Sequence, residues 1–535
     1  MRCRVQNPMP AADSPPNKKT RTSLARASGI VGAMTLLSRL LGFVREIMLA
    51  TAFGAGASMD AFLVALQIPN FGRRMFAEGA FSQAFVPVFT ETKTTKTHEE
   101  ARDLVAVVMG TLGGVLSIIT LIGCLSAPAL VWAFASGFAN NADKATLAGG
   151  LLRWTFPYLM FISLTSLAGG VLNTYGKFAL PAFTPVILNI CLIASAFIDG
   201  GSVQILAYAV FVAGILQFVV QLPAMAALRL LPRPRWSWGD ARVQRILRLM
   251  GPVLIGSSVA QLSLLLNSNL ATHFGDGSVS WLYYANRLME FPLGIFSIAV
   301  GTAILPALSA QHAVADLNKF SATLDWALRT MLIIGLPAGA GMMLAAHPLV
   351  AAVYGHGRFG DADVQMTTWA LWAYGMGFIG FSLVKVLVPG FYARQETRLP
   401  VRYAIIGLVS GMTLSLCLFA AHQALGFKGA HVGLAISTSL TAWVNSMLLL
   451  RRLRRDGVYV PQAGWRRFAG IIAAATLAMG LVVWAFGGLD ANWMKLDSLH
   501  RSLRLAVMIA AAIAAYFAVL FGLGVRPRDL RARRT

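Results

Sequence analysis

Apolar stretches long enough to cross a membrane recur along this 535-residue chain. A helix needs about 20 mainly apolar residues to span the hydrocarbon core of a bilayer. Only 13% of the residues are charged, against about 25% in soluble domains. We therefore predict an all-α integral membrane protein with 14 transmembrane helices. The predicted spans are 29–53, 58–90, 103–135, 147–174, 181–199, 203–230, 245–272, 278–308, 322–353, 363–392, 400–421, 428–450, 466–487 and 502–524.

Basic residues in the connecting segments predict the orientation of these helices. They gather in the amino-terminal tail and in every second gap, including residues 451–455, whereas the alternate gaps hold few. Lys and Arg are enriched on the cytoplasmic side of membrane proteins. Both termini are therefore predicted to be cytoplasmic, and residues 1–28 to be a disordered basic tail. The same placement explains the net charge of +23 without a nucleic-acid partner.

The chain also repeats itself. ATAFGAG at residues 50–56 recurs as ATHFGDG at residues 271–277, an offset of 221. Segments around Pro128 and Pro348 match at an offset of 220, and Pro181 matches Pro400 at 219. Six predicted helices separate the paired segments, so both copies have the same orientation, as in transporters with two lobes around a central site. We predict an N-lobe over 29–235 and a C-lobe over 236–458, with the last two helices and a basic tail (459–535) outside the repeat.

Charged residues lie inside several predicted spans. A charge near the bilayer centre costs roughly 2.5–3.5 kcal/mol on insertion scales, so such residues face a watery cavity or a partner. The second, eighth and tenth spans contain Pro69, Pro292 and Pro389 and are predicted to be interrupted or bent around this cavity. The charged residues are Arg39, Arg45, Glu46, Asp60, Arg73, Arg74, Glu78, Arg287 and Glu290, with Lys385 predicted as a further buried cation.

Spacing suggests pairings on the first helix. Glu46 follows Arg39 by seven residues and shares its face, so the two could pair. Arg39 could equally extend its charge to the membrane interface. Arg45 lies deeper in the helix, which favours a place in the cavity.

Two further pairs involve neighbouring charges. Arg73 and Arg74 are adjacent and point in different directions, so one is predicted to line the cavity and the other to pair with Glu78 or Glu46. Arg287 and Glu290 are three residues apart, a spacing that allows a salt bridge. A purely structural pair is therefore an alternative role for Arg287.

An arginine-rich cavity favours a diphosphate-bearing substrate, because a guanidinium binds phosphate bidentately and keeps its charge. The sequence has no clustered intramembrane carboxylates, no Walker-type phosphate loop and no cysteine pattern for a metal site. We therefore predict a transporter that is not an enzyme and has no cofactor or metal. Coupling to the membrane potential or to a monovalent cation remains an open alternative.

Long motifs resemble the MurJ/MviN family of lipid II flippases, which serve bacterial peptidoglycan synthesis. They are SRLLGFVRE, DAFLVALQIPNFGRRMFAEGAFSQAFVPVF, GSVSWLYYANRLMEFPLG and VKVLVPGFYARQ. The resemblance implies two six-helix lobes of the multidrug/oligosaccharidyl-lipid/polysaccharide exporter type, plus two helices that form a groove for a lipid tail. It also implies alternating access in the bacterial inner membrane, carrying undecaprenyl-diphosphate disaccharide-pentapeptide to the outer leaflet.

The resemblance also assigns residues. The family's essential cations fall on Arg39, Arg45, Arg73 and Arg287, and its essential acid falls on Asp60. Supporting or gating roles fall on Glu46, Arg74, Glu78, Glu290 and Lys385. This chain has Asn286 where many relatives have an acid, and Glu46 where Asp is common.

The resemblance names lipid II, membrane lipids and other cell-wall synthesis proteins as partners. Two alternatives stay open. One is a flippase for another polyprenyl-diphosphate glycan, of the O-antigen or capsule type. The other is a cell-wall scaffold that transports nothing and depends on the loops near Arg235 and Arg454.

Overall fold

The computed structural model describes residues 18–74, 81–198, 201–426, 429–487 and 491–525, and for residues 18–28, 253, 255–263, 295–303 and 491 the backbone alone. Every regular element in these ranges is a helix, which confirms the all-α prediction. Within them, nine helical segments are long and apolar enough to cross a membrane. The total of fourteen spans stays a prediction, and Glu78 lies outside the described residues.

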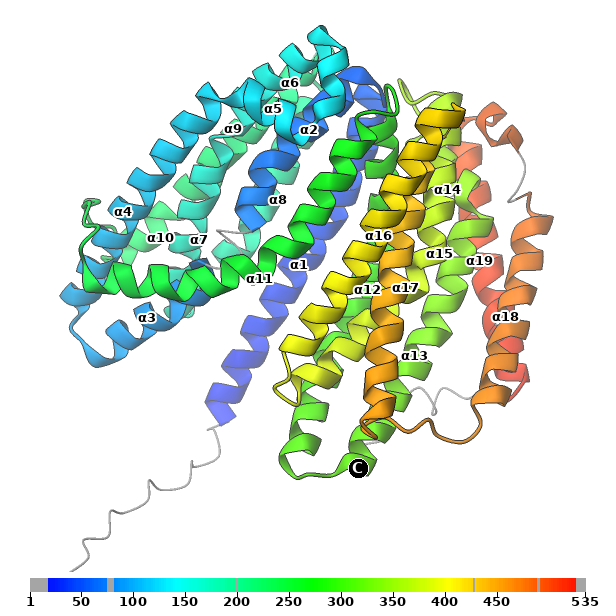
Figure 1. Cartoon of the computed structure of the whole chain (residues 1–535). Coiled ribbons are helices and arrows are strands. Elements are labelled where there is room, and N and C mark those ends of the chain that lie inside the picture. The colour runs from blue at the N-terminus through cyan, green and yellow to red at the C-terminus, as the bar shows by residue number, and fades with distance from the viewer. Residues whose placement is uncertain (1–17, 75–80, 199–200, 427–428, 488–490, 526–535) are drawn as a thin grey trace, which may run out of the picture.

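The first half of the chain forms one group of packed helices, the N-terminal group, drawn blue to cyan in Figure 1. Its helix α1 lies between this group and the rest of the molecule and packs most extensively on α8. The elements are α1 (Lys18–Phe53), α2 (Ala57–Gly72), α3 (Ser82–Thr95), α4 (His98–Leu125), α5 (Ala127–Phe134), η2 (Ser136–Asn140), α6 (Ala142–Thr155), α7 (Tyr158–Thr174), α8 (Ala179–Ser195), α9 (Val203–Val219) and α10 (Leu222–Ala227).

The second half forms the C-terminal group, in which α15 packs against α12, α13 and α17 (Figure 1). Its elements are α12 (Ser278–Ala313), α13 (Leu317–Leu344), α14 (Ala346–Tyr354), α15 (Asp361–Tyr392), α16 (Arg398–Leu425), α17 (His431–Arg455), α18 (Trp465–Ala485), η3 (Ala491–Lys495) and α19 (Ser498–Gly522). We call the end of the molecule with α5, α6 and residues 355–361 the upper end, and the end with α3 and residues 456–464 the lower end (Figure 1).

Helix α11 (Ala241–Ala271) runs across between the two groups (Figure 1). Its first turns belong with the N-terminal group, because Val243, Ile246 and Met250 are buried in one cluster with side chains of α3, α4 and α7. Arg245 also pairs with Glu91 of α3, with 2.9 Å between Nη2 and Oε2. Its other end contributes to the cavity described below, so α11 links the two groups.

The prolines of the eighth and tenth predicted spans do not interrupt them. Pro292 and Pro389 lie inside continuous helices, α12 of 36 residues and α15 of 32 residues, so of the two predicted alternatives, long or interrupted, these spans are long. A long membrane helix tolerates the lost hydrogen bond because neighbouring helices and local adjustments satisfy the freed backbone groups. The third and sixth predicted spans divide instead, with Pro128 and Pro223 in the first turn of α5 and α10. A proline costs little there, since those N–H groups have no partner within the helix.

Helix boundaries recur at a constant distance along the chain. Helix α4 runs from His98 to Leu125 and α13 from Leu317 to Leu344, so both ends are displaced by 219 residues. The same displacement separates the first residues of three further pairs: α5 and α14 (Ala127, Ala346), α6 and α15 (Ala142, Asp361), and α8 and α16 (Ala179, Arg398). The order of helices from residue 98 onward therefore recurs from residue 317 onward.

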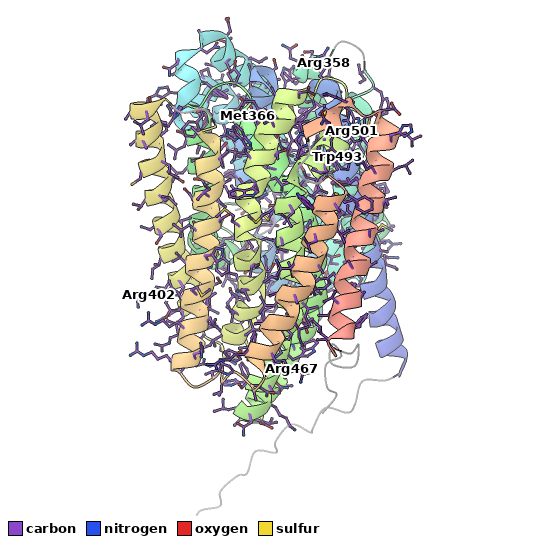
Figure 2. The ribbon with its side chains drawn as sticks, turned by 90° about the vertical axis from the view of Figure 1, so that its right-hand side faces the viewer. Arg358, Met366, Arg402, Arg467, Trp493 and Arg501 are labelled. Carbon is purple, nitrogen blue, oxygen red and sulfur yellow. The ribbon has the colours of Figure 1, made fainter. Side chains whose placement is uncertain are left out.

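The last two helices are fixed to the C-terminal group at the upper end. The buried Arg501 donates from Nη1 to the Ala351 carbonyl (2.9 Å) and from Nη2 to the Leu496 carbonyl (3.0 Å). Trp493 is completely buried beside it, and Figure 2 shows both residues near the upper end of α18 and α19. These contacts tie α19 to α14 and η3.

Candidate functional site

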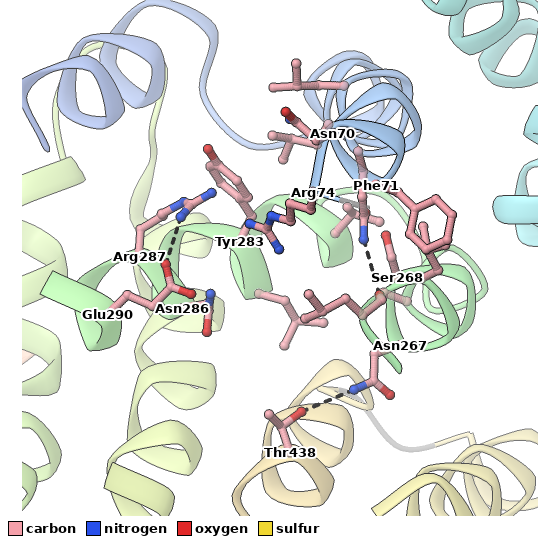
Figure 3. Close-up of a pocket in the computed structure, with 18 of the residues that line it drawn as sticks. Asn70, Phe71, Arg74, Asn267, Ser268, Tyr283, Asn286, Arg287, Glu290 and Thr438 are labelled. Carbon is pink, nitrogen blue, oxygen red and sulfur yellow. Dashed lines mark hydrogen bonds and ion pairs between the residues drawn. The ribbon is translucent and has the colours of Figure 1, made fainter. Parts of the chain in front are cut away.

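A polar cavity of about 280 Å³ lies where the two groups meet (Figure 3). Helices α1 and α2 supply one part of its wall, and α11, α12 and α17 supply another. Five residues that the sequence predicted for a site line it: Arg45, Arg73, Arg74, Arg287 and Glu290. The structure thus brings the four arginines of three separate segments together around one space.

Arg45 is held in place from both sides. Its Nη1 donates to Asn189 Oδ1 of α8 (2.9 Å), and Asn189 Nδ2 donates in turn to the Ser38 carbonyl of α1 (2.9 Å). Its Nη2 pairs with Glu46. Since only 15% of the Arg45 side chain is exposed, this guanidinium is a fixed part of the cavity wall.

Glu46 joins the two groups of helices. Its buried Oε1 accepts a hydrogen bond from the Tyr283 hydroxyl of α12 (2.9 Å), and Arg287 Nε lies 3.7 Å away. The carboxylate therefore pairs with Arg45 and faces α12, so the predicted pairing with Arg39 is wrong.

Arg287 combines three contacts in the cavity. Its guanidinium lies over the Tyr283 ring, 4.8 Å from the ring centre, and Nη1 is 2.8 Å from Glu290 Oε2. This confirms the salt bridge that the three-residue spacing predicted. Because Glu290 is 47% exposed, the pair is accessible from the cavity.

Arg73 and Arg74 directly follow the last residue of α2. Arg73 Nε donates to Asn70 Oδ1 (3.0 Å), one turn earlier. Both arginines line the cavity, where the sequence predicted only one, and Figure 3 shows Arg74 between the α12 and α11 sides of the space. The cavity therefore has one more cationic side chain than predicted.

Two predicted cations lie outside the cavity lining. Arg39 is exposed, and its Nη1 lies against Gly294 of α12, where an added Cβ would stand 1.9 Å away. Lys385 is exposed as well, so its predicted burial is wrong. The packed face of α15 carries Leu383, Val386 and Leu387 at helical spacing, and Lys385 projects off that face.

Asp60 lies at the upper end, outside the cavity lining, and is completely buried. Oδ1 accepts from the Ser280 N–H (2.8 Å) and hydroxyl (2.6 Å), and Oδ2 accepts from the Gly277 N–H (2.8 Å) and from Lys144 Nζ (3.1 Å). Lys144 also pairs with Asp276 at 2.8 Å. A carboxylate at the first turn of α12 is favoured by the exposed N–H groups and the helix dipole there. We call Asp60, Lys144, Asp276 and Ser280 the upper latch.

Further contacts join the groups near the latch. The Gly137 N–H donates to Thr272 Oγ1 (3.1 Å), and the Arg358 N–H donates to the Thr51 carbonyl (3.0 Å). In the described part of the chain, the hydrogen bonds between the N-terminal group and α12–α19 lie at this end or in the cavity wall. The two groups are therefore fastened together at the upper end.

Sequence reasoning missed Asn189, Lys144, Ser280 and Tyr283. Lys144 is one of the few basic residues in the alternate gaps, and its isolation there is a signal for a specific role. Tyr283 lies within the quoted motif GSVSWLYYANRLMEFPLG. Asn189 and Ser280 are neutral side chains that give no signal of their role, which depends on the partner that the fold brings near.

Chemically, the cavity suits an anion. Four arginines line it, and among the described residues Glu46 and Glu290 are the acids that pair with them, so the described part of the cluster holds more arginines than acids. Guanidinium groups in a partly buried site hold phosphate oxygens by charge-assisted hydrogen bonds.

The fold is that of a class of membrane transporters. A solved inward-facing multidrug resistance MATE family transporter of the MOP superfamily matches it with a TM-score of 0.60, at 14% identity, covering 80% of this chain and 98% of that one. A structure described as lipid II flippase MurJ in an inward closed conformation matches with a TM-score of 0.75, at 25% identity, covering 91% of this chain and 97% of that one.

Sequence comparison identifies the family within this class. The family model described as lipid II flippase MurJ matches residues 49–504. A probable lipid II flippase MurJ of Vibrio cholerae is 44% identical, covering 95% of this chain and 98% of the relative. Lipid II flippase MurJ of Burkholderia cenocepacia is 41% identical, covering 96% and 99%. The chain belongs to the MurJ family of lipid II flippases.

Proposed function

We propose that this protein moves lipid II, undecaprenyl-diphosphate disaccharide-pentapeptide, from the inner to the outer leaflet of the bacterial cytoplasmic membrane. The cavity carries this proposal, because it gathers four arginines around a space between two groups of membrane helices. Such a site suits a diphosphate, and the chain's family supports the identity of the lipid. The protein acts as a transporter and not as an enzyme.

The proposed architecture has 14 transmembrane helices, two lobes related by a parallel repeat, and two additional helices. The constant displacement of 219 residues between helix starts supports the repeat. The lower end is the cytoplasmic one in this proposal, because Arg402 and Arg467 lie there (Figure 2) and basic residues favour the cytoplasmic side. Both termini are then cytoplasmic.

The proposed transport cycle uses the arginines of the cavity and the contacts of the upper latch. The head group enters from the lower end, and its diphosphate binds Arg45, Arg73 and Arg287 with Arg74, while the undecaprenyl tail stays in the lipid beside α18 and α19. Neutralising the arginines lets the lobes approach below and separate above. The upper latch must break in that step, which gives Asp60 its role in the cycle. Arg39 of α1 lies against Gly294 of α12, below the cavity, and takes part in closing the lower end.

The membrane potential is the proposed energy source for the return step. The empty cavity carries excess positive charge, and moving one charge through 100 mV is worth about 2.3 kcal/mol. A potential that is negative inside therefore favours the inward-facing empty state. Membrane lipids surround the protein throughout, and other cell-wall synthesis proteins are proposed partners.

The test uses cells that depend on this chain as their only flippase. An enzyme that cleaves lipid II, added outside, reports how much substrate has reached the outer leaflet. We expect cleavage with the wild type and with Arg402→Ala, whose side chain is exposed at the lower end, and none with Arg45→Ala at equal expression. Undiminished cleavage with Arg45→Ala, or none with the wild type, would contradict the proposal, and the second result would favour another polyprenyl-diphosphate glycan or a scaffold.

A further inference from the structure

The part of the cavity wall on α11 and α17 carries no charge and has three polar side chains, Asn267, Ser268 and Thr438, among apolar ones. On α11 and α17 its lining residues are Leu264, Leu265, Asn267, Ser268, Ala271, Leu434 and Thr438. Figure 3 shows Asn267 and Thr438 on the opposite side of the space from Arg287 and Glu290. A site for a diphosphate alone has no need of this neutral half.

Asn267 is oriented by hydrogen bonds with α16 and α17. Its Nδ2 donates to Thr438 Oγ1 (3.2 Å), and its Oδ1 accepts from the buried Ser415 hydroxyl of α16 (3.3 Å). The Thr438 hydroxyl gives its own proton to the Leu434 carbonyl (2.8 Å), so its oxygen must accept from the amide. An amide has two N–H donors and two acceptor lone pairs. One of each is therefore left for a molecule in the cavity.

Two more neutral side chains are available. Ser268, the next residue on α11, and Asn286, which precedes Arg287 on α12, both line the cavity. In the described part of the protein neither side chain makes a hydrogen bond. Asn286 lies between the arginine-rich half and the neutral half, where it can contact groups attached directly to a bound diphosphate.

We propose that Asn267, Ser268 and Asn286 form a subsite for the uncharged N-acetylated sugar that adjoins the diphosphate. Sugar hydroxyl and acetamido groups both donate and accept hydrogen bonds without charge, and so do amide and hydroxyl side chains. Arginine can only donate. The cavity volume of about 280 Å³ is close to the lower limit for small-ligand sites, which suits a diphosphate with an adjoining sugar and leaves the remaining head group outside. This inference rests on the proposed function and adds which residues recognise the sugar.

The test compares two probes on the full chain in lipid nanodiscs. One is undecaprenyl diphosphate without sugar, and the other is the same lipid carrying the disaccharide from which the peptide has been removed. Asn267→Leu and Ser268→Ala are expected to weaken binding of the sugar-bearing probe about three- to tenfold, the range of one lost neutral hydrogen bond, and to leave the sugar-free probe unchanged. Arg73→Ala is expected to weaken both. Thr438→Val removes the acceptor of the Asn267 amide and is expected to weaken binding of the sugar-bearing probe alone. Thr413→Val is its control, because each hydroxyl bonds the carbonyl four residues earlier but Thr413 is exposed outside the cavity.

Equal weakening of both probes by the α11 variants, or no change in either, would overturn the subsite. Because Asn267→Leu also removes the acceptor of Ser415, Ser268→Ala and Asn286→Ala decide the matter if that variant fails to fold. If the wild type binds neither probe, the proposed function itself is overturned. If the wild type binds both probes and the variants weaken neither one selectively, only the subsite is overturned.

Discussion

Asp60 and Arg45 are both charged side chains within the helices of the N-terminal group, yet their surroundings are opposite. The two oxygens of Asp60 accept four hydrogen bonds. The donors are Lys144 of α6, the N–H and the hydroxyl of Ser280 in α12, and the N–H of Gly277, which precedes α12. In the cavity, Arg45 Nε and the neighbouring Glu46 Oε2 are buried without a hydrogen-bond partner in the described part of the chain. A buried polar atom without a partner costs free energy, and the hydrogen-bonding groups of the cavity wall are less fully satisfied than those of the upper latch.

The comparison separates two uses of buried charge. At the upper latch the protein satisfies its own charges, which stabilises one arrangement of the two groups. In the cavity it leaves hydrogen-bonding capacity and positive charge unused, which stabilises a complex with an anion. We infer that substitutions in the first region change the balance between conformations, whereas substitutions in the second change affinity.

Asp60→Ala should have the largest effect on the conformational balance. Removing one partner of a buried ion pair costs about 3–5 kcal/mol, and here the first N–H groups of α12 lose their acceptor and Lys144 keeps Asp276 alone. We expect growth support to be lost, together with the cross-link between cysteines placed at Thr51 and Arg358, whose backbones are bonded across the upper end. Asp143→Ala is the matched control, since Asp143 is an exposed acid on α6. Wild-type cross-linking in Asp60→Ala would show that the latch does not hold this state.

Asn189→Leu tests whether the fixed position of Arg45 matters for affinity. A hydrogen bond to a charged group is worth about 1.5–3 kcal/mol, so we expect at least tenfold weaker binding of undecaprenyl diphosphate. Combined with Arg45→Ala, the Asn189 change should add nothing further, because it acts through Arg45. Additive losses in the double variant would mean that Asn189 contributes independently.

Glu290→Gln should strengthen the binding of undecaprenyl diphosphate, in contrast to Asn189→Leu. Its ion pair with Arg287 is nearly half exposed, and such pairs contribute well under 1 kcal/mol. Freeing Arg287 should therefore tighten diphosphate binding only about two- to threefold. Weaker binding in a titration of this variant would indicate that Glu290 positions Arg287 and does not compete with the ligand.

The smallest expected effect is on stability at the first turn of α11. A hydrogen bond from the Arg242 guanidinium lowers the pKa of Asp240 below its ordinary value. The stabilisation is thus present above the ordinary carboxyl pKa, about 4, and is lost as the pH falls through the lowered folded-state value. Asp240→Asn should unfold at a slightly lower temperature than the wild type from pH 7 to 5, and the gap should narrow as the pH falls below the ordinary carboxyl pKa. A gap that does not depend on pH would contradict this.

Much of the fold could be predicted from the sequence, because apolar length and charge placement act over whole segments. Each predicted span contains a helix, and four arginines of the quoted motifs, Arg45, Arg73, Arg74 and Arg287, do meet in one cavity. The exact breaks could not be predicted: Pro389 is absorbed into α15, whereas Pro223 starts a new helix.

The failures at the site have a common physical cause. Periodicity tells which residues share a helix face, but not which neighbouring helix that face meets. Glu46 therefore pairs with Arg45 and accepts a hydrogen bond from Tyr283 of α12, and it does not pair with Arg39. Lys385 is exposed although much of its helix is packed against neighbours.

The central claim is that the arginines lining the cavity, and not the basic surface in general, bind the diphosphate. Equilibrium binding of undecaprenyl diphosphate to the full chain in nanodiscs tests it most directly, with Arg45→Ala, Arg287→Ala and the exposed-surface variant Arg402→Ala compared side by side. We expect roughly ten- to hundredfold weaker binding for each cavity variant, the value of a hydrogen bond to a charged group, and less than a twofold change for Arg402→Ala. Equal affinities for all three variants would contradict the account.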